Sequence, residues 1–322
     1  MVGKPSKSMT DRAPEEVFPG AVTRAEAGPL MRLATKASVA VALILVAVKM
    51  AAWLLTGSIS ILSSLIDSLM DVLASAINLF AVHHALQPPD AEHRFGHGKA
   101  EPLAGLGQSA FIAGSAVLLT IEAVRRLFEP QAVVEIEVGI AVMVFSIGLT
   151  VLLVAFQRYV VRRTNSTVIG ADALHYESDV LINGSVIISL GLSHWFGWQA
   201  ADPIFAILIA AYLLRGAWSI AAKSLDILMD REFPDEERAK ITEIALSHAQ
   251  VTGMHDLRTR RAGLQQFIQL HLEMDGDKRL IEAHQIADEV EAWICEAYPG
   301  AEVIIHQDPH GLAEDHQGFA GP

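Results

Sequence analysis

Six long apolar runs, separated by short polar segments, occupy the first two thirds of this 322-residue chain. A helix needs about 20 mostly apolar residues to cross the hydrocarbon core of a membrane, and each run has roughly this length. The runs cover residues 34–55, 58–84, 102–121, 138–157, 168–195 and 203–222. We therefore predict a domain of six transmembrane helices over residues 33–230, with both ends of the chain on the same side of the membrane.

Residues 231–309 show instead the pattern of a small soluble domain. Alternating apolar and polar positions predict three strands, the first two joined by a turn at Gly263, and amphipathic periodicity predicts two helices. The helices are expected at 234–248 and 279–298, and the strands at 254–261, 265–275 and 301–307. The order αββαβ is typical of a two-layer α+β domain.

The two ends of the chain are polar, and we predict flexible tails at residues 1–32 and 310–322. The first segment contains several prolines and has no apolar stretch of the kind found in a secretory signal peptide. We therefore expect no signal peptide and place both segments outside the folded domains.

Acidic residues are concentrated in the last quarter of the chain. The formal net charge is −13, and residues 231–322 hold 18 Asp and Glu against 8 Lys and Arg. This balance disfavours nucleic acid as the main partner, because phosphate binding requires basic residues. Cys295 is the only cysteine, which excludes a disulfide framework and a cysteine-rich zinc site.

The basic residues of the loops predict the orientation in the membrane, because cytoplasmic loops carry more Lys and Arg. One side has essentially Arg125 and Arg126, beside two glutamates. The other side has Arg32, Lys36, Arg94, Lys99, Arg158, Arg162, Arg163, Lys223 and Arg231. We expect this second side, both termini and the soluble domain to face the cytoplasm.

Two apolar runs carry ionisable residues in i, i+4 pairs: Asp67 with Asp71, and His175 with Asp179. On a helix each pair lies on one face, one turn apart. Since a charged residue at the centre of a bilayer costs about 2.5–3.5 kcal/mol on insertion scales, such residues are usually functional. Three carboxylates and one imidazole fit a tetrahedral Zn²⁺ and also admit Cd²⁺ or Fe²⁺. Metal binding at such a site releases protons, which is the chemistry of metal/proton exchange.

Other polar residues of the same runs are predicted to have supporting roles. Asn78 and Asn183 are expected to form interhelical hydrogen bonds. Glu177 faces away from the His175 pair on an ideal helix and is interpreted as polar but not metal-binding. Asp172 precedes His175 by about one turn, which leaves it as a candidate neighbour of the site.

Histidines outside the membrane runs form two further groups. Asp90, His93 and His97 lie within one loop and can close around a metal; the glycines there do not form a phosphate-binding loop. In the soluble domain four histidines and an aspartate can converge, although their spacing fits scattered surface residues equally well: His255, His271, His284, His306 and Asp308. We interpret His83 and His84 as interfacial residues, and His248, His310 and His316 as surface or tail residues.

Several motifs together resemble the cation diffusion facilitator family, and within it the bacterial zinc/iron efflux antiporters. The resemblance runs from about residue 33 to residue 309. It rests on GSISILSSLIDSLMD at 57–71, HRFGHGKAEPLAGLGQSAF at 93–111, LHYESD at 174–179, MHDLRTR at 254–260, FIQLHLEMD at 267–275 and VIIHQDP at 303–309.

The resemblance implies a homodimer that exchanges cytoplasmic metal for external protons, with a metallochaperone-like cytoplasmic domain that regulates transport. It also implies a charge pair, Lys99 with Asp230, at the junction of membrane and cytoplasmic parts. The implied metal ligands are Asp67, Asp71, His175 and Asp179 at the transport site, Asp90, His93 and His97 at a loop site, and His255, His271, His284, His306 and Asp308 at a binuclear cytoplasmic site near the dimer interface.

Two other functions stay open from the residues alone. An intramembrane metallohydrolase needs an open metal position and a general base, and the HExxH motif is absent from the sequence. A metal-gated channel or sensor needs no proton exchange. We expect a transporter driven by the proton gradient, because the sequence has no nucleotide-binding or phosphorylation motif.

Overall fold

The computed structural model describes residues 24–57, 59–128, 137–198 and 200–311. The chain divides into a helical unit, Arg24–Arg231, and a smaller α+β unit built from Glu232 onward. The remaining parts of the two predicted tails, residues 1–23 and 312–322, lie outside the described residues. His316 lies there too.

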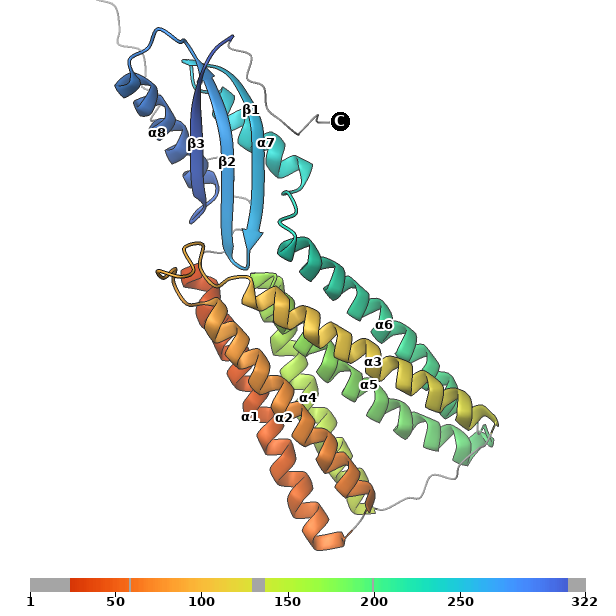
Figure 1. Ribbon diagram of the computed structural model, residues 1–322. Coiled ribbons are helices and arrows are strands. Elements are labelled where there is room, and N and C mark those ends of the chain that lie inside the picture. The colour runs from red at the N-terminus through yellow and green to blue at the C-terminus, as the bar shows by residue number, and fades with distance from the viewer. Residues whose placement is uncertain (1–23, 58, 129–136, 199, 312–322) are drawn as a thin grey trace, which may run out of the picture. The chain divides into compact units, whose positions relative to one another are not determined.

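The helical unit contains six long helices. Figure 1 shows α1, α2 and α4 running alongside one another, while α3, α5 and α6 form a second group. Helix α5 packs against helices of both groups. The bounds are α1 Arg24–Thr56, α2 Ile59–Ala85, α3 Ala100–Phe128, α4 Glu137–Thr164, α5 Thr167–Phe196 and α6 Ala201–Leu228.

The predicted six transmembrane helices are confirmed, and one of them is chemically different. Among the described residues, α1, α2, α3, α4 and α6 are long and apolar enough to cross a membrane. Helix α5 is 30 residues long but carries Asp172, Glu177 and Asp179. Two of these carboxylates have partners on other helices: Asp172 accepts hydrogen bonds from four of them, and Glu177 pairs with Arg158 of α4.

Helix α1 begins at Arg24, so the predicted tail of residues 1–32 is too long. Ala27 and Met31 are completely buried one turn apart, and they continue the buried face that includes Ala34. Pro29 lies inside the helix. It removes only one backbone hydrogen bond so close to the helix start, which the burial of Ala27 and Met31 offsets.

A buried carboxylate connects the first five helices. Asp172 of α5 is 1% exposed, and both of its oxygens accept hydrogen bonds from side chains of other helices. The donors are Ser38 of α1 at 2.6 Å, Asn78 of α2 at 2.9 Å, Gln108 of α3 at 3.5 Å and Gln157 of α4 at 2.6 Å. The predicted interhelical hydrogen bond of Asn78 is therefore confirmed. Asp172 is a packing centre of the bundle.

The smaller unit has the predicted order αββαβ. Its sheet order is β1-β2-β3, and β2 pairs with β3 in parallel. Gly263, in the turn between β1 and β2, has a φ of +60°, a conformation that glycine adopts without strain. Strand β1 begins at residue 251, three residues before the prediction. The bounds are α7 Asp235–Leu246, β1 Val251–Ala262, β2 Gln265–Met274, α8 Leu280–Ala297 and β3 Glu302–Pro309.

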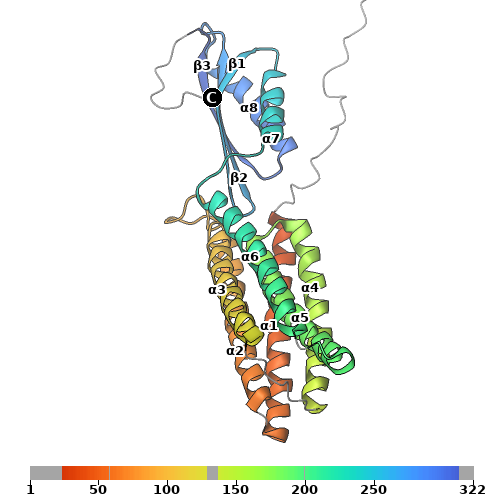
Figure 2. The ribbon, with the colours of Figure 1, turned by 90° about the vertical axis from the view of Figure 1, so that its right-hand side faces the viewer.

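Both helices of this unit cover the same face of the sheet, as Figure 2 shows. Their apolar residues and alternate residues of β2 form one core; it includes Ile241, Val290, Ile294, Ile268, Leu270 and Leu272. Because side chains alternate along a strand, Gln269, His271 and Glu273 lie on the opposite face. This second face of the sheet, which the two helices do not cover, can therefore carry polar and metal-binding side chains.

We expect the Asp172→Asn variant to be less stable. An amide oxygen accepts more weakly than a carboxylate, and the amide nitrogen replaces one acceptor oxygen and then opposes the two donors that faced it. Since interhelical hydrogen bonds contribute about 0.6 kcal/mol each on average, the expected loss is roughly 2 kcal/mol. Thermal unfolding in detergent measures it.

The matched control for Asp172→Asn is Ser185→Ala, which removes a hydroxyl that donates only to Ile182 of its own helix. We expect a change within about 0.5 kcal/mol for this variant. Equal melting temperatures for the two variants would contradict the role of Asp172 as a packing centre.

Candidate metal centres

Helices α2 and α5 bring three of the four predicted transport ligands together. Nε2 of His175 lies 2.9 Å from Oδ1 of Asp71. One donor atom from each of Asp71, His175 and Asp179 lies within 4.8 Å of the other two. His175 and Asp179 share a face of α5 because they are one helical turn apart. Two carboxylates and an imidazole at this separation can hold a divalent cation.

Asp67, the fourth predicted ligand, lies outside this cluster and is exposed. It precedes Asp71 by one turn of α2, so it lies on nearly the same face but further along the helix axis. The sequence spacing predicts the shared face correctly, while the meeting point of α2 and α5 falls at Asp71. Asp67 stays a predicted ligand that needs a shift of α2 or of its own side chain.

Lys49 of α1 lies beside the same cluster and was missed by the sequence analysis. Its ammonium group donates to Oγ of Ser68 at 2.7 Å and to the backbone oxygen of Ser64 at 3.2 Å. It interacts electrostatically with Asp71, Asp179 and Asp67. The sequence does contain a clue to Lys49, because it is a lysine inside the apolar run 34–55. Ionisable residues at such positions are usually functional.

The other polar residues of α5 have different partners. Glu177 points away from His175 as predicted, and its carboxylate accepts hydrogen bonds from Arg158 of α4 and, at 2.9 Å, from the Tyr212 hydroxyl of α6. Asn183 donates to the backbone oxygen of Asp179 within its own helix, so the prediction of an interhelical bond is wrong for this residue.

The predicted loop cluster is present between α2 and α3. Asp90 lies 3.3 Å from Nδ1 of His93 through one oxygen and 3.3 Å from Nε2 of His97 through the other. The backbone N–H groups of His93 and Glu92 also donate to Asp90. These bonds, that of His93 first, lower the pKa of the Asp90 carboxyl group, which therefore stays ionised and available to a cation.

His84 also belongs to the surroundings of the loop cluster, although the sequence analysis placed it at the membrane interface. Its ring meets that of His97 edge to face, with centroids 4.5 Å apart. His97 is 8% exposed, and its Nδ1 has no hydrogen-bond partner among the described residues. A metal bound through Nε2 of His97 leaves a proton on this Nδ1.

The cytoplasmic cluster is organised around the buried carboxylate of Asp308. One oxygen lies 2.8 Å from Nδ1 of His271 and 3.5 Å from Nε2 of His255, and the other lies 3.1 Å from Nε2 of His306. His271 and His306 are aligned across the parallel pair β2–β3. A carboxylate that faces different imidazoles with its two oxygens can bridge two metal ions.

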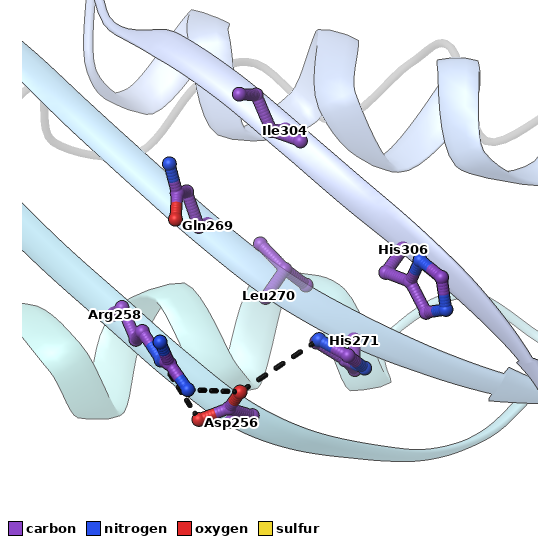
Figure 3. Close-up of a pocket in the computed structure, with 7 residues that line it drawn as sticks. All are labelled: Asp256, Arg258, Gln269, Leu270, His271, Ile304 and His306. Atoms are coloured by element: carbon purple, nitrogen blue, oxygen red, sulfur yellow. Dashed lines mark hydrogen bonds and ion pairs between the residues drawn. The ribbon is translucent and has the colours of Figure 1, made fainter.

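A shallow hollow of about 390 Å³ adjoins this cluster on the open face of the sheet. Figure 3 shows Asp256 between the guanidinium of Arg258 and the ring of His271. His306 lies beside His271. Asp256 has a φ of +48°, a left-handed conformation that Asp tolerates better than most residues. The hollow gives solvent, and therefore metal ions, access to His271 and His306.

Glu273 holds His255 from its other side. Its Oε1 lies 3.1 Å from Nδ1 of His255, and its Oε2 lies 2.9 Å from Nδ1 of His310. The hydrogen bonds from His310 and His255 lower the pKa of Glu273. A Cβ atom on Gly253 would come within 2.9 Å of the carboxylate, so glycine makes room for it. His310 is therefore part of this network, and its side chain is exposed, as expected of a surface residue.

Two further histidines and the predicted charge pair can also be placed. His284 lies on α8 at 3.5 Å from Asp288, and it is not brought to the cytoplasmic cluster. His248 is buried and pairs with Glu289 at 3.1 Å, which corrects its interpretation as a surface residue. The charge pair of Lys99 with Asp230 is present, with Nζ and Oδ1 2.9 Å apart.

Six membrane helices with a convergent cation site, followed by a domain with a histidine cluster, define a membrane protein that handles metal cations. Residues 35–229 match the family model of the cation efflux transmembrane domain, and residues 233–310 match that of the cation efflux protein cytoplasmic domain. The chain therefore belongs to the cation efflux family of multi-span membrane transporters.

Curated relatives cover most of the chain. The cation-efflux pump FieF of Shigella boydii serotype 18 is 48% identical over 282 residues, which are 88% of this chain and 94% of the relative. FieF of Salmonella choleraesuis is 49% identical over the same lengths. Among solved structures, the zinc form of CzrB is 36% identical with a TM-score of 0.25, covering 26% of this chain and 98% of that chain.

We expect Glu273→Ala to weaken Zn²⁺ binding at the cytoplasmic cluster by about 10- to 100-fold, the usual effect of losing a carboxylate that orients a metal-binding histidine. Without Glu273, Nδ1 of His255 loses the acceptor that keeps its proton there and leaves Nε2 for the metal. Glu273→Gln retains an acceptor oxygen and should keep most of the affinity. Titration of the full-length protein in detergent against a competing chelator measures both.

Glu289→Ala is the matched control for Glu273→Ala, because Glu289 pairs with His248, which lies outside the cluster. This control should leave Zn²⁺ affinity unchanged. If Glu273→Ala also left it unchanged, Glu273 would have no part in orienting His255.

Proposed function

We propose that this transporter exports divalent metal ions, Zn²⁺ and also Cd²⁺ and Fe²⁺, from the cytoplasm in exchange for external protons. The main observation that supports this proposal is the cluster of Asp71, His175 and Asp179, which two membrane helices contribute. FieF relatives at 48% identity are cation-efflux pumps, which supports the direction of transport. The protein works as a homodimer in the inner membrane, with both termini in the cytoplasm.

The exchange follows from the chemistry of the three side chains. Carboxylates and imidazole bind a metal only when deprotonated, so metal and protons compete for the same atoms. Metal entering from the cytoplasm displaces protons from His175 and the carboxylates. After the protein has rearranged to face outward, external protons bind these groups and the metal leaves. Asp67 joins as the fourth ligand in the loaded site.

The loop and cytoplasmic clusters act before the transport step. Metal at Asp90, His93 and His97 loads the cytoplasmic mouth. Metal at the Asp308 cluster favours association of the two cytoplasmic domains and so promotes transport. His284 lies away from that cluster within one chain, and it completes the binuclear site only from a second copy across a dimer interface. The pair of Lys99 and Asp230 stabilises the junction between the two parts.

Replacing Asp71 or Asp179 by Ala should abolish exchange, because each leaves only two of the three convergent donors. The measurement is Zn²⁺-driven proton flux in proteoliposomes with an imposed pH gradient. Glu177→Gln is the control, since Glu177 lies on the same helix as Asp179 and pairs with Arg158 instead. It should retain Zn²⁺ exchange, with some loss of stability.

Persistent exchange in Asp71→Ala or Asp179→Ala would show that the cluster is not the transport site. Metal flux that did not depend on the pH gradient and did not saturate with metal concentration would contradict antiport and favour a channel. Flux of Cd²⁺ and Fe²⁺ at the same pH gradient gives the order of preference among the metals.

A further inference from the structure

A lysine inside the membrane helices is directed toward the proposed transport site. Lys49 lies two turns before the end of α1, and no other charged residue follows Lys36 in this helix. Its ammonium group is within hydrogen-bonding distance of Ser64 and Ser68 on α2. Ser68 is completely buried and stands directly after Asp67 on α2. The positive charge is thereby held against the helix that carries two of the proposed ligands.

The direction of the side chain is unusual for a membrane lysine. Long basic side chains near a helix end normally extend to the water interface, because a charge in hydrocarbon costs about 2.5–3.5 kcal/mol. Lys49 instead turns inward to α2, where neutral serine acceptors alone do not balance its charge. Its electrostatic partners are Asp71, Asp179 and Asp67, and these carboxylates offset part of the cost of burying its charge.

The summed charge of Lys49 and the proposed ligands favours a divalent cation. Three carboxylates contribute three negative charges, Lys49 contributes one positive charge, and a metal-binding histidine is neutral. The site with Lys49 is thus two charges negative, which one divalent cation neutralises. Without Lys49 the same site would be three charges negative and would remain charged with a divalent ion bound.

We propose that Lys49 is a tethered counter-cation of the transport site, which matches it to divalent ions and keeps their binding weak enough for release. This inference rests on the proposed function, in which Asp67, Asp71, His175 and Asp179 hold the transported metal. Lys49 touches none of the proposed ligands and acts through its field. It is therefore a residue that sets affinity rather than a ligand.

A purely structural role predicts the opposite effect. If Lys49 only clamped α1 to α2 through Ser64 and Ser68, its removal would loosen the helix pair that carries the ligands and weaken metal binding. If its charge repels the metal, its removal tightens binding. Like charges repel each other strongly across short distances in protein, so the expected change is at least about tenfold in affinity.

The experiment uses the full-length protein in detergent with the other two clusters disabled by His93→Ala and Asp308→Ala. Zn²⁺ is titrated against a competing chelator at fixed pH. Lys49→Gln keeps a donor for Ser68 but removes the charge, and Lys49→Met removes both. We expect the Kd of both variants to fall at least about tenfold. Lys49→Arg should stay close to the parent protein.

Ser68→Ala is the matched control, because it removes the acceptor and leaves the lysine charge in place. Its Kd should change by less than about threefold, since no charge is lost. In proteoliposomes, Lys49→Gln of the otherwise unchanged protein should lower both KM and kcat, because tighter binding slows release. Melting temperatures identify any variant that fails to fold, and Lys49→Met then provides the second test of the charge.

The outcomes separate this inference from the proposed function. If Asp71→Asn abolishes Zn²⁺ binding in the same background while Lys49→Gln and Lys49→Met leave the Kd unchanged or raise it, the role of Lys49 is wrong and the transport site stands. If Zn²⁺ binding in that background is indifferent to Asp71→Asn, the transport site itself is wrong, and the inference about Lys49 falls with it.

Discussion

The compensation of acidic side chains inside the membrane governs the organisation of this protein. Helix α5 carries three carboxylates, and each is balanced in a different way. Asp172 accepts hydrogen bonds from uncharged side chains of four other helices, and Glu177 pairs with Arg158. Asp179 shares its surroundings with Asp71 and a single imidazole. Asp172 and Glu177 are thus compensated by partners within the chain, and these contacts fix the packing of the bundle. The surroundings of Asp179 keep negative charge that a cation has to balance.

The same donor types recur in the cytoplasmic domain under different physical conditions. Asp308 is buried, but His271 and His306 border an open hollow on the face of the sheet that α7 and α8 leave uncovered. Water can solvate this cluster when it is empty, so its occupancy follows the metal concentration of the surrounding solution. In the membrane, by contrast, an empty cluster of charged side chains is costly, so under the proposed function its occupancy by metal or protons is tied to the rearrangement of the helices. Under the proposed function, the same carboxylate and imidazole ligands thus suit metal sensing in the α+β domain and metal transport in the membrane domain.

Sequence periodicity predicted the fold because apolar length and strand alternation are local properties. It also predicted which residues share a face, as His175 with Asp179 and His271 with Glu273 do. It could not predict where two elements meet, since that depends on packing between them. For this reason Asp67 and His284 were expected in clusters that the structure forms without them, while the contact of His310, directly after β3, with Glu273 was not expected. The start of α1 was predicted too late for a related reason, because the polar composition of residues 1–32 was taken as that of a tail, whereas the packing of Ala27 and Met31 extends the helix to Arg24.

The convergence of three donors rather than four has a consequence for a site that must both bind and release its ion. A tetrahedral cation held by Asp71, His175 and Asp179 retains one open position, which water fills. Asp67 lies one helical turn away on the same helix as Asp71, so under the proposed function a shift of α2 or of the Asp67 side chain would exchange that water for a carboxylate. Coordination and helix position are then coupled through α2. Lys49, bonded to Ser68 between the two aspartates, would move with α2 and keep its charge beside the site throughout this displacement.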